Sequence, residues 1–479
     1  MIANHIQTFN WNRRAWPAQL ACLILAATAL PVLAFTNTMQ FAGLLFVGIG
    51  LIVIPFMPVW RIPYLLGFCY LFPRYVEVHE GWQMVLMTRS PEPGFMLQIG
   101  VVPFDGVLIA TAIAILLPKL LRRERILTFG KWWGALFASI YICSIIYGFG
   151  NYQSPHDAEF AALWSLFRFS LMWVVLSNAV ADPKQRKIIA YSLLACGVFL
   201  ALGGIFRYIT APLDSAEEAW NHRASSFGIG ISVLGALSIL TGMTALNIFC
   251  YHPARRIKLG ALACFFIAFT TVCLTFARGP MLVFIILTSL ILFRAKKSYF
   301  IVWMLLVAII IGGALSSKEV NGRISLIQSG SLFEESYRFT QYTATLGLIQ
   351  DHPIIGVGGF RYYDAIYHYL PTNYIKRLLH SHSMLLQITA ETGVFGLIAF
   401  VGFFATLILQ GKRNAKIHDD FHIWRVGALY GIVGFFIAQL SDFILYDYRC
   451  TLALLGYIAI TQLHPSIKPI VRKDSPFAR

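Results

Sequence analysis

Two stretches in the last third of the chain contain the residue types that could carry out chemistry. The first is His352–Arg361, in which Gly356, Gly358 and Gly359 form a glycine-rich turn that leads into an arginine. Successive backbone N–H groups in such a turn can bind an anion. The pattern is weak on its own, because glycine also simply makes turns. The stretch therefore predicts a tight turn, with anion binding as a candidate role for Gly358 and Arg361.

The second stretch begins at His382, directly before a long apolar run. Ser383 is suited to cap the helix that this run predicts. Gln387 and Glu391 follow Ser383 at steps of four residues, so the three side chains form one polar stripe on the helix. Polar groups at membrane depth usually face other helices or a watery cavity. We expect Glu391 to be a buried, hydrogen-bonded structural group.

Several motifs together resemble the O-antigen ligase and polymerase superfamily of membrane glycosyltransferases. His382-Ser383, followed after nine residues by Gly393 and after two more by Gly396, is similar to the signature of that family. The preceding Pro353–Gly358 looks like the family's turn ahead of its histidine. Two arginine motifs are also similar: Thr275-Phe276-Ala277-Arg278-Gly279 resembles the family's serine-arginine-glycine hairpin, with Ala277 where serine is common, and Arg223-Ala224-Ser225-Ser226-Phe227-Gly228 resembles its entry to a middle span.

The resemblance covers about 220–400 and implies an enzyme that takes a glycan from undecaprenyl diphosphate on the periplasmic face and joins it to an acceptor. By motif position, Arg278 and Arg338 would bind the diphosphate, and His382 would lie by the acceptor hydroxyl as general base or orienting group. The residue types suit this chemistry, because arginine offers permanent planar donors to phosphate oxygens and histidine accepts protons near neutral pH. The family implies no nucleotide and no metal, so we expect no cofactor.

Other polar residues are candidates for substrate binding, each with a structural alternative. Tyr362 can stack on a sugar or merely pack the loop. Arg338 can be a solvated surface residue, and Arg278 can lie at the membrane interface without binding anything. The possible substrate-binding residues are Arg223, Gly358, Arg361, Tyr362 and Ser383.

A His-x-His pair at His380 and His382 raises the question of a metal site. The neighbouring sequence supplies neither a carboxylate nor a cysteine to complete one. The eight cysteines show no Cys-x-x-Cys spacing and lie in or beside apolar runs, which is typical of small core residues. We therefore expect no metal.

The composition places these motifs in a membrane protein. The 479 residues are 58% hydrophobic and only 13% charged, against roughly 25% charged residues in soluble proteins. Apolar runs of about 20 residues recur along the chain, and each can cross a hydrocarbon core of about 30 Å as a helix. The sequence thus predicts an all-α polytopic membrane protein, a single domain over 1–479 with about 14 transmembrane helices. The predicted spans are 17–35, 40–59, 62–76, 99–118, 132–150, 160–180, 188–209, 226–249, 258–275, 279–293, 299–316, 383–410, 424–441 and 449–464.

The lysines and arginines indicate how the spans are oriented. If both termini are cytoplasmic, 25 of the 38 basic residues fall on the cytoplasmic side, as bacterial inner-membrane proteins prefer. This topology accounts for most of the net charge of +16, so nucleic acid is not expected as a partner. It also isolates 11 basic residues on the periplasmic side, which favours an anionic substrate there. They are Arg74, Arg89, Arg223, Arg278, Lys318, Arg323, Arg338, Arg361, Lys376, Arg377 and Arg449.

One long loop, 317–382, lies between the eleventh and twelfth predicted spans and is periplasmic in this topology. It carries the catalytic motif, and apolar residues at helical spacing over 336–350 predict a helix within it. Loops of this length in compact proteins are usually functional or disordered. Its aromatic residues favour order.

The sequence leaves several functions open. Within glycan transfer, the acceptor distinguishes a ligase that modifies lipid A-core from a Wzy-type polymerase for O-antigen or exopolysaccharide and from a protein O-glycosyltransferase. A flippase or transporter of lipid-linked oligosaccharide is the alternative from another class. Transporters tend to show repeated halves and helices broken near the midplane, and no repeat is evident here. An enzyme would gather its arginines with His382, whereas a flippase would distribute them along a path.

Overall fold

The computed structural model describes residues 49–50, 52–71, 103–151, 157–210, 223–226, 230–315, 337–371 and 380–462. The chain divides into two compact units. The first comprises Met1–Phe129 and Phe167–Cys196, and the second comprises Gly130–Leu166 and Gly197–Arg479. All the described candidate site residues belong to the second unit.

Nine helices within the described ranges are long and apolar enough to cross a membrane. They confirm a helical, multi-pass membrane protein and coincide with nine of the predicted spans. Two further apolar helices, α12 (Lys297–Leu315) and α19 (Tyr448–Thr461), coincide with two more. The nine are α4 (Pro103–Leu121), α5 (Lys131–Asn151), α6 (Asp157–Ala179), α7 (Pro183–Thr210), α9 (Ile231–Tyr251), α10 (Arg255–Thr275), α11 (Arg278–Ala295), α17 (Met384–Asn414) and α18 (His422–Ala438).

The total of about 14 spans stays a prediction. The predicted span 17–35 lies outside the described residues, and half of 40–59 does too. The segment 62–76 overlaps α3 (Arg61–Leu71), whose 11 residues rise only about 16 Å. The described part of that helix is therefore shorter than the hydrocarbon core.

In the first unit, a buried ion pair joins two helices at membrane depth. Arg168 of α6 donates from Nε and Nη2 to the two carboxylate oxygens of Asp105 in α4, at 2.6 and 2.8 Å. Both side chains are buried. An arginine within a span needs such a partner, because an uncompensated buried charge is costly.

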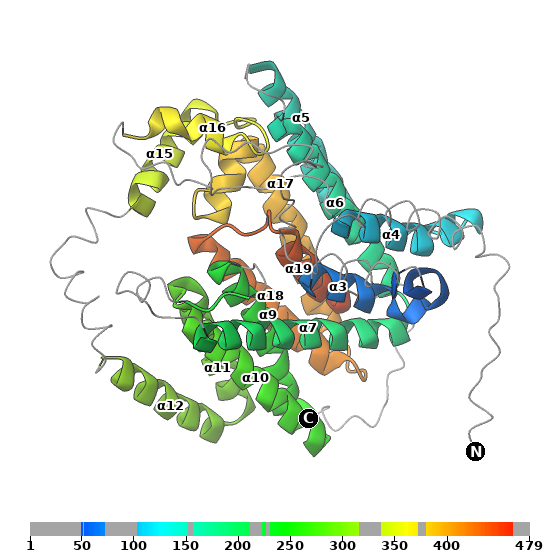
Figure 1. Ribbon diagram of the computed structural model, residues 1–479, viewed down its shortest axis with the longest axis vertical. Coiled ribbons are helices and arrows are strands. Elements are labelled where there is room, and N and C mark those ends of the chain that lie inside the picture. Colours follow the sequence, from blue (N-terminus) through cyan, green and yellow to red (C-terminus); the bar gives the residue numbers. More distant parts are fainter. Residues whose placement is uncertain are drawn as a thin grey trace. The chain divides into compact units, whose positions relative to one another are not determined.

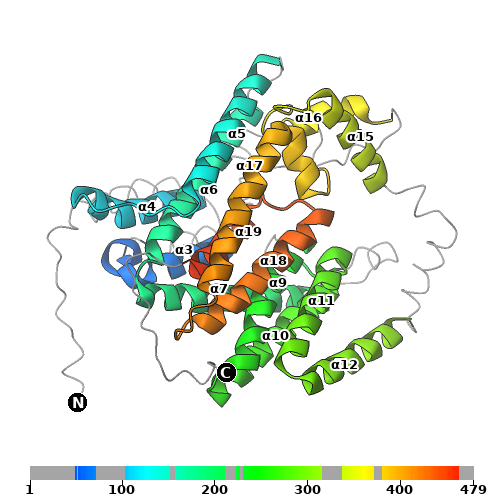
Figure 2. The same ribbon diagram turned by 180° about the vertical axis from the view of Figure 1, so that it is seen from behind.

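In the second unit, α9 lies at the centre of a bundle formed with α10, α11 and α18 (Figures 1 and 2). Small residues let these helices approach closely. A Cβ on Gly427 would lie 2.9 Å from the Thr244 Cα, and one on Gly431 would lie 3.0 Å from the Leu240 Cα. Such backbone proximity is the usual way in which helices associate in lipid, where the hydrophobic effect gives little drive.

Helix α17 is broken at Gly393, where the backbone has φ +68° and ψ −175°. The glycine-rich turn fills the break. Val357 N donates to Ala390 O at 2.9 Å, Gly358 N donates to Glu391 O at 3.0 Å, and Val394 N donates to Pro353 O at 2.8 Å. The turn and the histidine motif are therefore a single structural unit, joined by main-chain hydrogen bonds.

The described part of the long loop folds over the start of α17. It contains α15 (Tyr337–Asp351), which confirms the predicted loop helix, and the short helix α16 (Tyr362–Ile366). Both lie at the same end of α17 in the two views (Figures 1 and 2). Their apolar side chains pack around the buried Tyr362, whose hydroxyl lies 2.7 Å from Thr345 Oγ1.

Because of the break in α17, we expect any side chain at position 393 to destabilise the protein. We expect Gly393→Ala to lower the melting temperature in detergent, because this backbone conformation is essentially restricted to glycine and costs another residue about 1–3 kcal/mol. The new Cβ would also lie only 2.0 Å from Ile354 O. Gly260→Ala in α10 is the matched control, since a Cβ there meets nothing within 4 Å. Equal melting temperatures for the two variants would contradict the role assigned to the break.

Candidate active site

His382 is held on a short, firmly anchored segment ahead of α17. Ser381 Oγ donates to Ser383 O at 2.8 Å, and Gln387 Oε1 accepts from Ser381 N at 2.8 Å. Ser383 occupies the predicted N-cap position, but its own side chain makes no capping hydrogen bond. His382 itself has φ +52°, in the left-handed region that residues other than glycine rarely adopt. Such conformations persist only where the surroundings impose them, and they cluster at functional sites.

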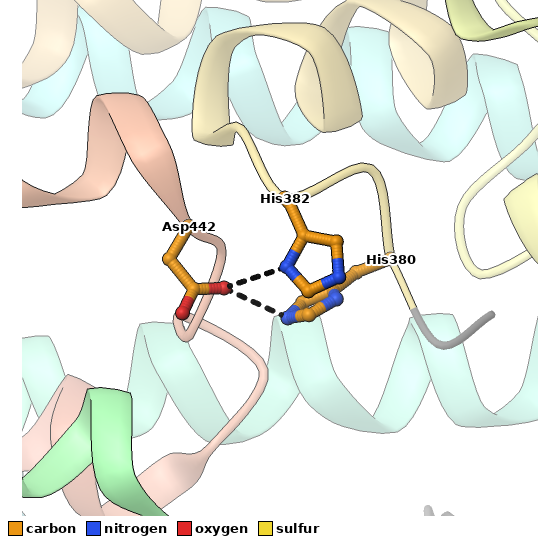
Figure 3. Close-up of side chains that lie close together, drawn as sticks. All are labelled: His380, His382 and Asp442. Carbon is orange, nitrogen blue, oxygen red and sulfur yellow. Dashed lines mark ion pairs between the residues drawn. The ribbon is translucent and has the colours of Figure 1, made fainter. Parts of the chain in front are cut away.

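Three side chains converge at this segment: His380, His382 and Asp442 (Figure 3). Asp442 Oδ1 lies 3.0 Å from His380 Nε2 and 3.5 Å from His382 Nδ1. The two imidazole rings are 4.5 Å apart between centroids. Asp442 comes from the segment after η3 (Gln439–Ser441), which ends α18. The carboxylate that the neighbouring sequence lacked is thus supplied from 60 residues further along the chain.

The three side chains affect one another's charge. Burial by itself raises the pKa of Asp442, but the side chain of His382 and the charge of His380 outweigh it and hold that pKa well below its usual range. Burial also lowers the pKa of His380 to about 4, and the neighbouring charges of His382 and Arg338 act in the same direction. At neutral pH the carboxylate is therefore ionised, and His380 is a neutral imidazole with a lone pair to offer.

Arg278 is brought to the same end of the bundle by a tight turn between α10 and α11. Phe276 has φ +50°, and Arg278 is the first residue of α11 and is exposed. A Cβ on the next residue, Gly279, would lie 2.3 Å from Ser441 Oγ. The predicted hairpin thus packs directly on the residue before Asp442.

Arg338 lies in the first turn of α15 and is exposed. The positive charge of Arg338 contributes to lowering the pKa of His380. The same helix contacts the histidine segment, because Tyr342 Oη donates to His382 O at 3.1 Å. Arg223 is half-buried, and the adjoining Ala224 N donates to Leu274 O at 2.9 Å, close to the Arg278 turn.

Arg361 is placed differently from the other candidate arginines. Its side chain is completely buried, and its guanidinium donates to the carboxylates of Glu159 and Asp364. Gly358 has φ +106° and lies against α5, and its N–H is used in the bond to α17. Since Tyr362 is also buried, these three candidates hold the turn in place, and their contacts favour structural roles.

Glu391, at the break in α17, is the buried and hydrogen-bonded group that the sequence predicts. Glu391 is completely buried, and Gln387 Nε2 donates to its Oε1 at 2.7 Å. The hydroxyl of Tyr446 donates to the other carboxylate oxygen. The Tyr446 ring also stacks on Phe360 in the glycine-rich turn, with centroids 3.9 Å apart. The stripe of Gln387 and Glu391 thus joins the turn to the segment that follows Asp442.

Residues 263–401 match the family model for O-antigen ligase. The chain contains an O-antigen ligase domain. The match includes Arg278, Arg338 and His382, and it ends before Asp442. No curated protein matches the chain at a significant level.

Asp442 is the residue that sequence reasoning missed. The available signal was topological: in the predicted orientation, span 424–441 ends on the same side of the membrane as His382. An ionised side chain at that end was therefore a possible partner for the histidine pair.

The contacts of Arg361 predict that its substitution lowers the stability of the protein, whereas substitution of an arginine that only binds substrate does not. We expect Arg361→Gln to lower the free energy of unfolding by about 3–5 kcal/mol, because it leaves the buried carboxylate of Glu159 without its partner. Arg338→Gln is the control, since that side chain is exposed. Melting temperatures in detergent would measure both, and equal stability of the two variants would exclude the role assigned to Arg361.

Proposed function

We propose that this O-antigen ligase domain transfers a glycan from undecaprenyl diphosphate to the hydroxyl group of an acceptor. One observation carries the proposal. His382, on a strained and anchored segment, faces the ionised Asp442 at the end of the bundle that also holds the Arg278 turn and the Arg338 helix. A base and two exposed cations at the same end of the bundle fit the transfer of a group from a diphosphate.

In this scheme the transfer is a single displacement at the anomeric carbon. The acceptor oxygen forms a bond to the anomeric carbon of the glycan, and the bond between that carbon and the diphosphate oxygen breaks. The acceptor proton passes to His382, and the electron pair leaves on the diphosphate. Histidine is the usual side chain for such a transfer near neutral pH.

Asp442 acts as a positioning residue in this scheme. Its carboxylate faces His382 Nδ1, which favours the tautomer protonated at that atom and leaves Nε2 to accept the proton. It also stabilises the imidazolium that forms. The arrangement follows the general logic of a base that is oriented by a third group.

The arginines act on the leaving group. Negative charge grows on the diphosphate as the glycan departs, and fixed cations stabilise charge most where it develops. Arg278 and Arg338 are exposed, so their planar donors are available to phosphate oxygens. Arg223, close to the Arg278 turn, is a further candidate for contact with the donor. The scheme requires neither a nucleotide nor a metal ion.

The proposal includes a location in the cell. We place the chain in a bacterial inner membrane with both termini in the cytoplasm, so that His382 and the arginines face the periplasm. The bias of lysines and arginines in the sequence supports this orientation. Acceptor identity separates lipopolysaccharide ligation from polymerisation of O-antigen or exopolysaccharide and from protein glycosylation, and ligation is the first candidate because of the matched family model.

The transfer reaction tests the site directly. Purified protein in vesicles would receive an undecaprenyl-diphosphate glycan and an acceptor, with EDTA present. We expect His382→Asn to lower kcat by about 10²–10⁴-fold, because it removes the base while asparagine still tolerates the left-handed backbone. Asp442→Asn should lower kcat by a smaller factor. Arg278→Ala should lower kcat by about 10²–10³-fold, as loss of one electrostatic donor does elsewhere.

Arg256→Ala is the matched control for loss of charge, since that exposed arginine lies at the other end of α10. Full activity of His382→Asn and Arg278→Ala would refute the site. A ladder of products would identify a polymerase, and a single adduct on core lipid or protein would identify a ligase. Movement of the lipid across vesicles without any transfer would favour the flippase.

A further inference from the structure

His380 adds a third ligand atom to the proposed catalytic pair. The nitrogens of His380 and His382 and the Asp442 oxygen all lie within 4.8 Å of one another. Two imidazoles and one carboxylate form a ligand set that binds first-row divalent cations, and Zn²⁺ is bound especially well by such nitrogen and oxygen donors. The proposed transfer reaction makes no use of His380.

The spacing fits a zinc ion. Zn–N and Zn–O bonds of about 2.0–2.1 Å in tetrahedral geometry place neighbouring ligand atoms about 3.3 Å apart. The observed separations from Asp442 Oδ1 are 3.0 Å to His380 Nε2 and 3.5 Å to His382 Nδ1. These two edges differ from that value by only a few tenths of an ångström, and the third, between the two histidine nitrogens, is within 4.8 Å.

We propose that His380, His382 and Asp442 form a binding site for Zn²⁺ or a similar divalent cation, and that the bound ion inhibits glycan transfer. The inhibition, though not the binding, rests on the proposed function.

A second observation points to a ligand at this position. Nδ1 of His382 is buried and directed towards Asp442 Oδ1, but the 3.5 Å between them is too long for a well-formed hydrogen bond (Figure 3). A buried polar nitrogen without a partner is costly, and a metal ion would satisfy it. The side chains of His380 and His382 keep 21% and 28% of their surface exposed, so an ion can enter and retain an open position for water.

The charged groups around the site have opposite effects on the binding of a cation. The carboxylate oxygen of Asp442 and the two imidazole nitrogens favour a divalent cation. The positive charge of Arg338, which reaches His380, disfavours it. We therefore expect reversible binding, which suits inhibition better than a permanent structural metal.

The inhibition follows from the chemistry of the imidazole. A neutral imidazole that coordinates a metal through Nδ1 carries its proton on Nε2. That nitrogen then has no lone pair for the acceptor proton, and Asp442 can no longer orient the ring. A bound ion thus removes the base without altering the fold.

Binding can be measured without any glycan. Protein purified without a polyhistidine tag would be titrated with Co²⁺, whose visible spectrum reports coordination, and then with Zn²⁺ in competition. We expect one equivalent per chain. His380→Ala and Asp442→Asn should each weaken binding by at least about 100-fold, since even loss of an outer-shell partner costs 10–100-fold. His368→Ala, which removes an exposed histidine from η2 (Tyr367–Tyr369), is the matched control.

Transfer rates with and without Zn²⁺ then test the inhibition. Each variant is compared with its own rate in EDTA, so a change in basal rate does not affect the result. The wild type and His368→Ala should be inhibited by one equivalent of Zn²⁺, whereas His380→Ala should resist it.

Absence of saturable binding, or binding that survives both ligand substitutions, would overturn the metal site. Binding without inhibition would overturn the regulatory part. Transfer that is absent from every preparation would count against the proposed function instead, because the cobalt spectrum reports the metal site separately.

Discussion

The geometry of the site depends on the break in α17. A helix interrupted at Gly393 leaves carbonyl groups at Ala390 and Glu391 that need donors, and the glycine-rich turn supplies them. Because Gly393 and Gly356 both adopt positive φ, the two backbones can approach closely enough to form these bonds. The first segment of α17 is thereby fixed to the loop, and His382 at its start is fixed with it.

A second constraint comes from the buried arginines. Arg361 and Arg168 lie in the protein interior beside carboxylates that neutralise them. Arg425 and Arg449 are likewise buried and pair with Asp419 and Asp447. An arginine paired in this way holds two elements together. Because its charge is already neutralised, it attracts an anionic substrate only weakly. Arg278 and Arg338 differ because they are exposed at turns and helix starts. Burial thus divides arginines that look alike in the sequence into structural and candidate functional groups.

Asp442 lies on a segment that is attached both to the Arg278 turn and to the break in α17. The turn that holds Arg278 packs on Ser441, and Tyr446 bonds to Glu391 at the break in α17. The segment between α18 and α19 is therefore held from both sides, and Asp442 lies between its two points of attachment. A carboxylate fixed in this way can orient one histidine, and the same oxygen can serve as a metal ligand when a second histidine lies 3.0 Å away.

The sequence by itself determined the helical, multi-pass architecture, because runs of about 20 apolar residues have no other stable form in lipid. It also indicated the similarity to O-antigen ligases over 263–401, since the spacing from His382 to Gly396 and the Arg278 turn are local patterns. Tertiary structure decided what no local pattern contains. It paired His382 with Asp442, buried Arg361 against Glu159, and used the N–H groups of the glycine turn to fill a helix break. These contacts join residues up to 202 positions apart, and they form because buried charges and unpaired backbone groups must find partners wherever the folded chain supplies them.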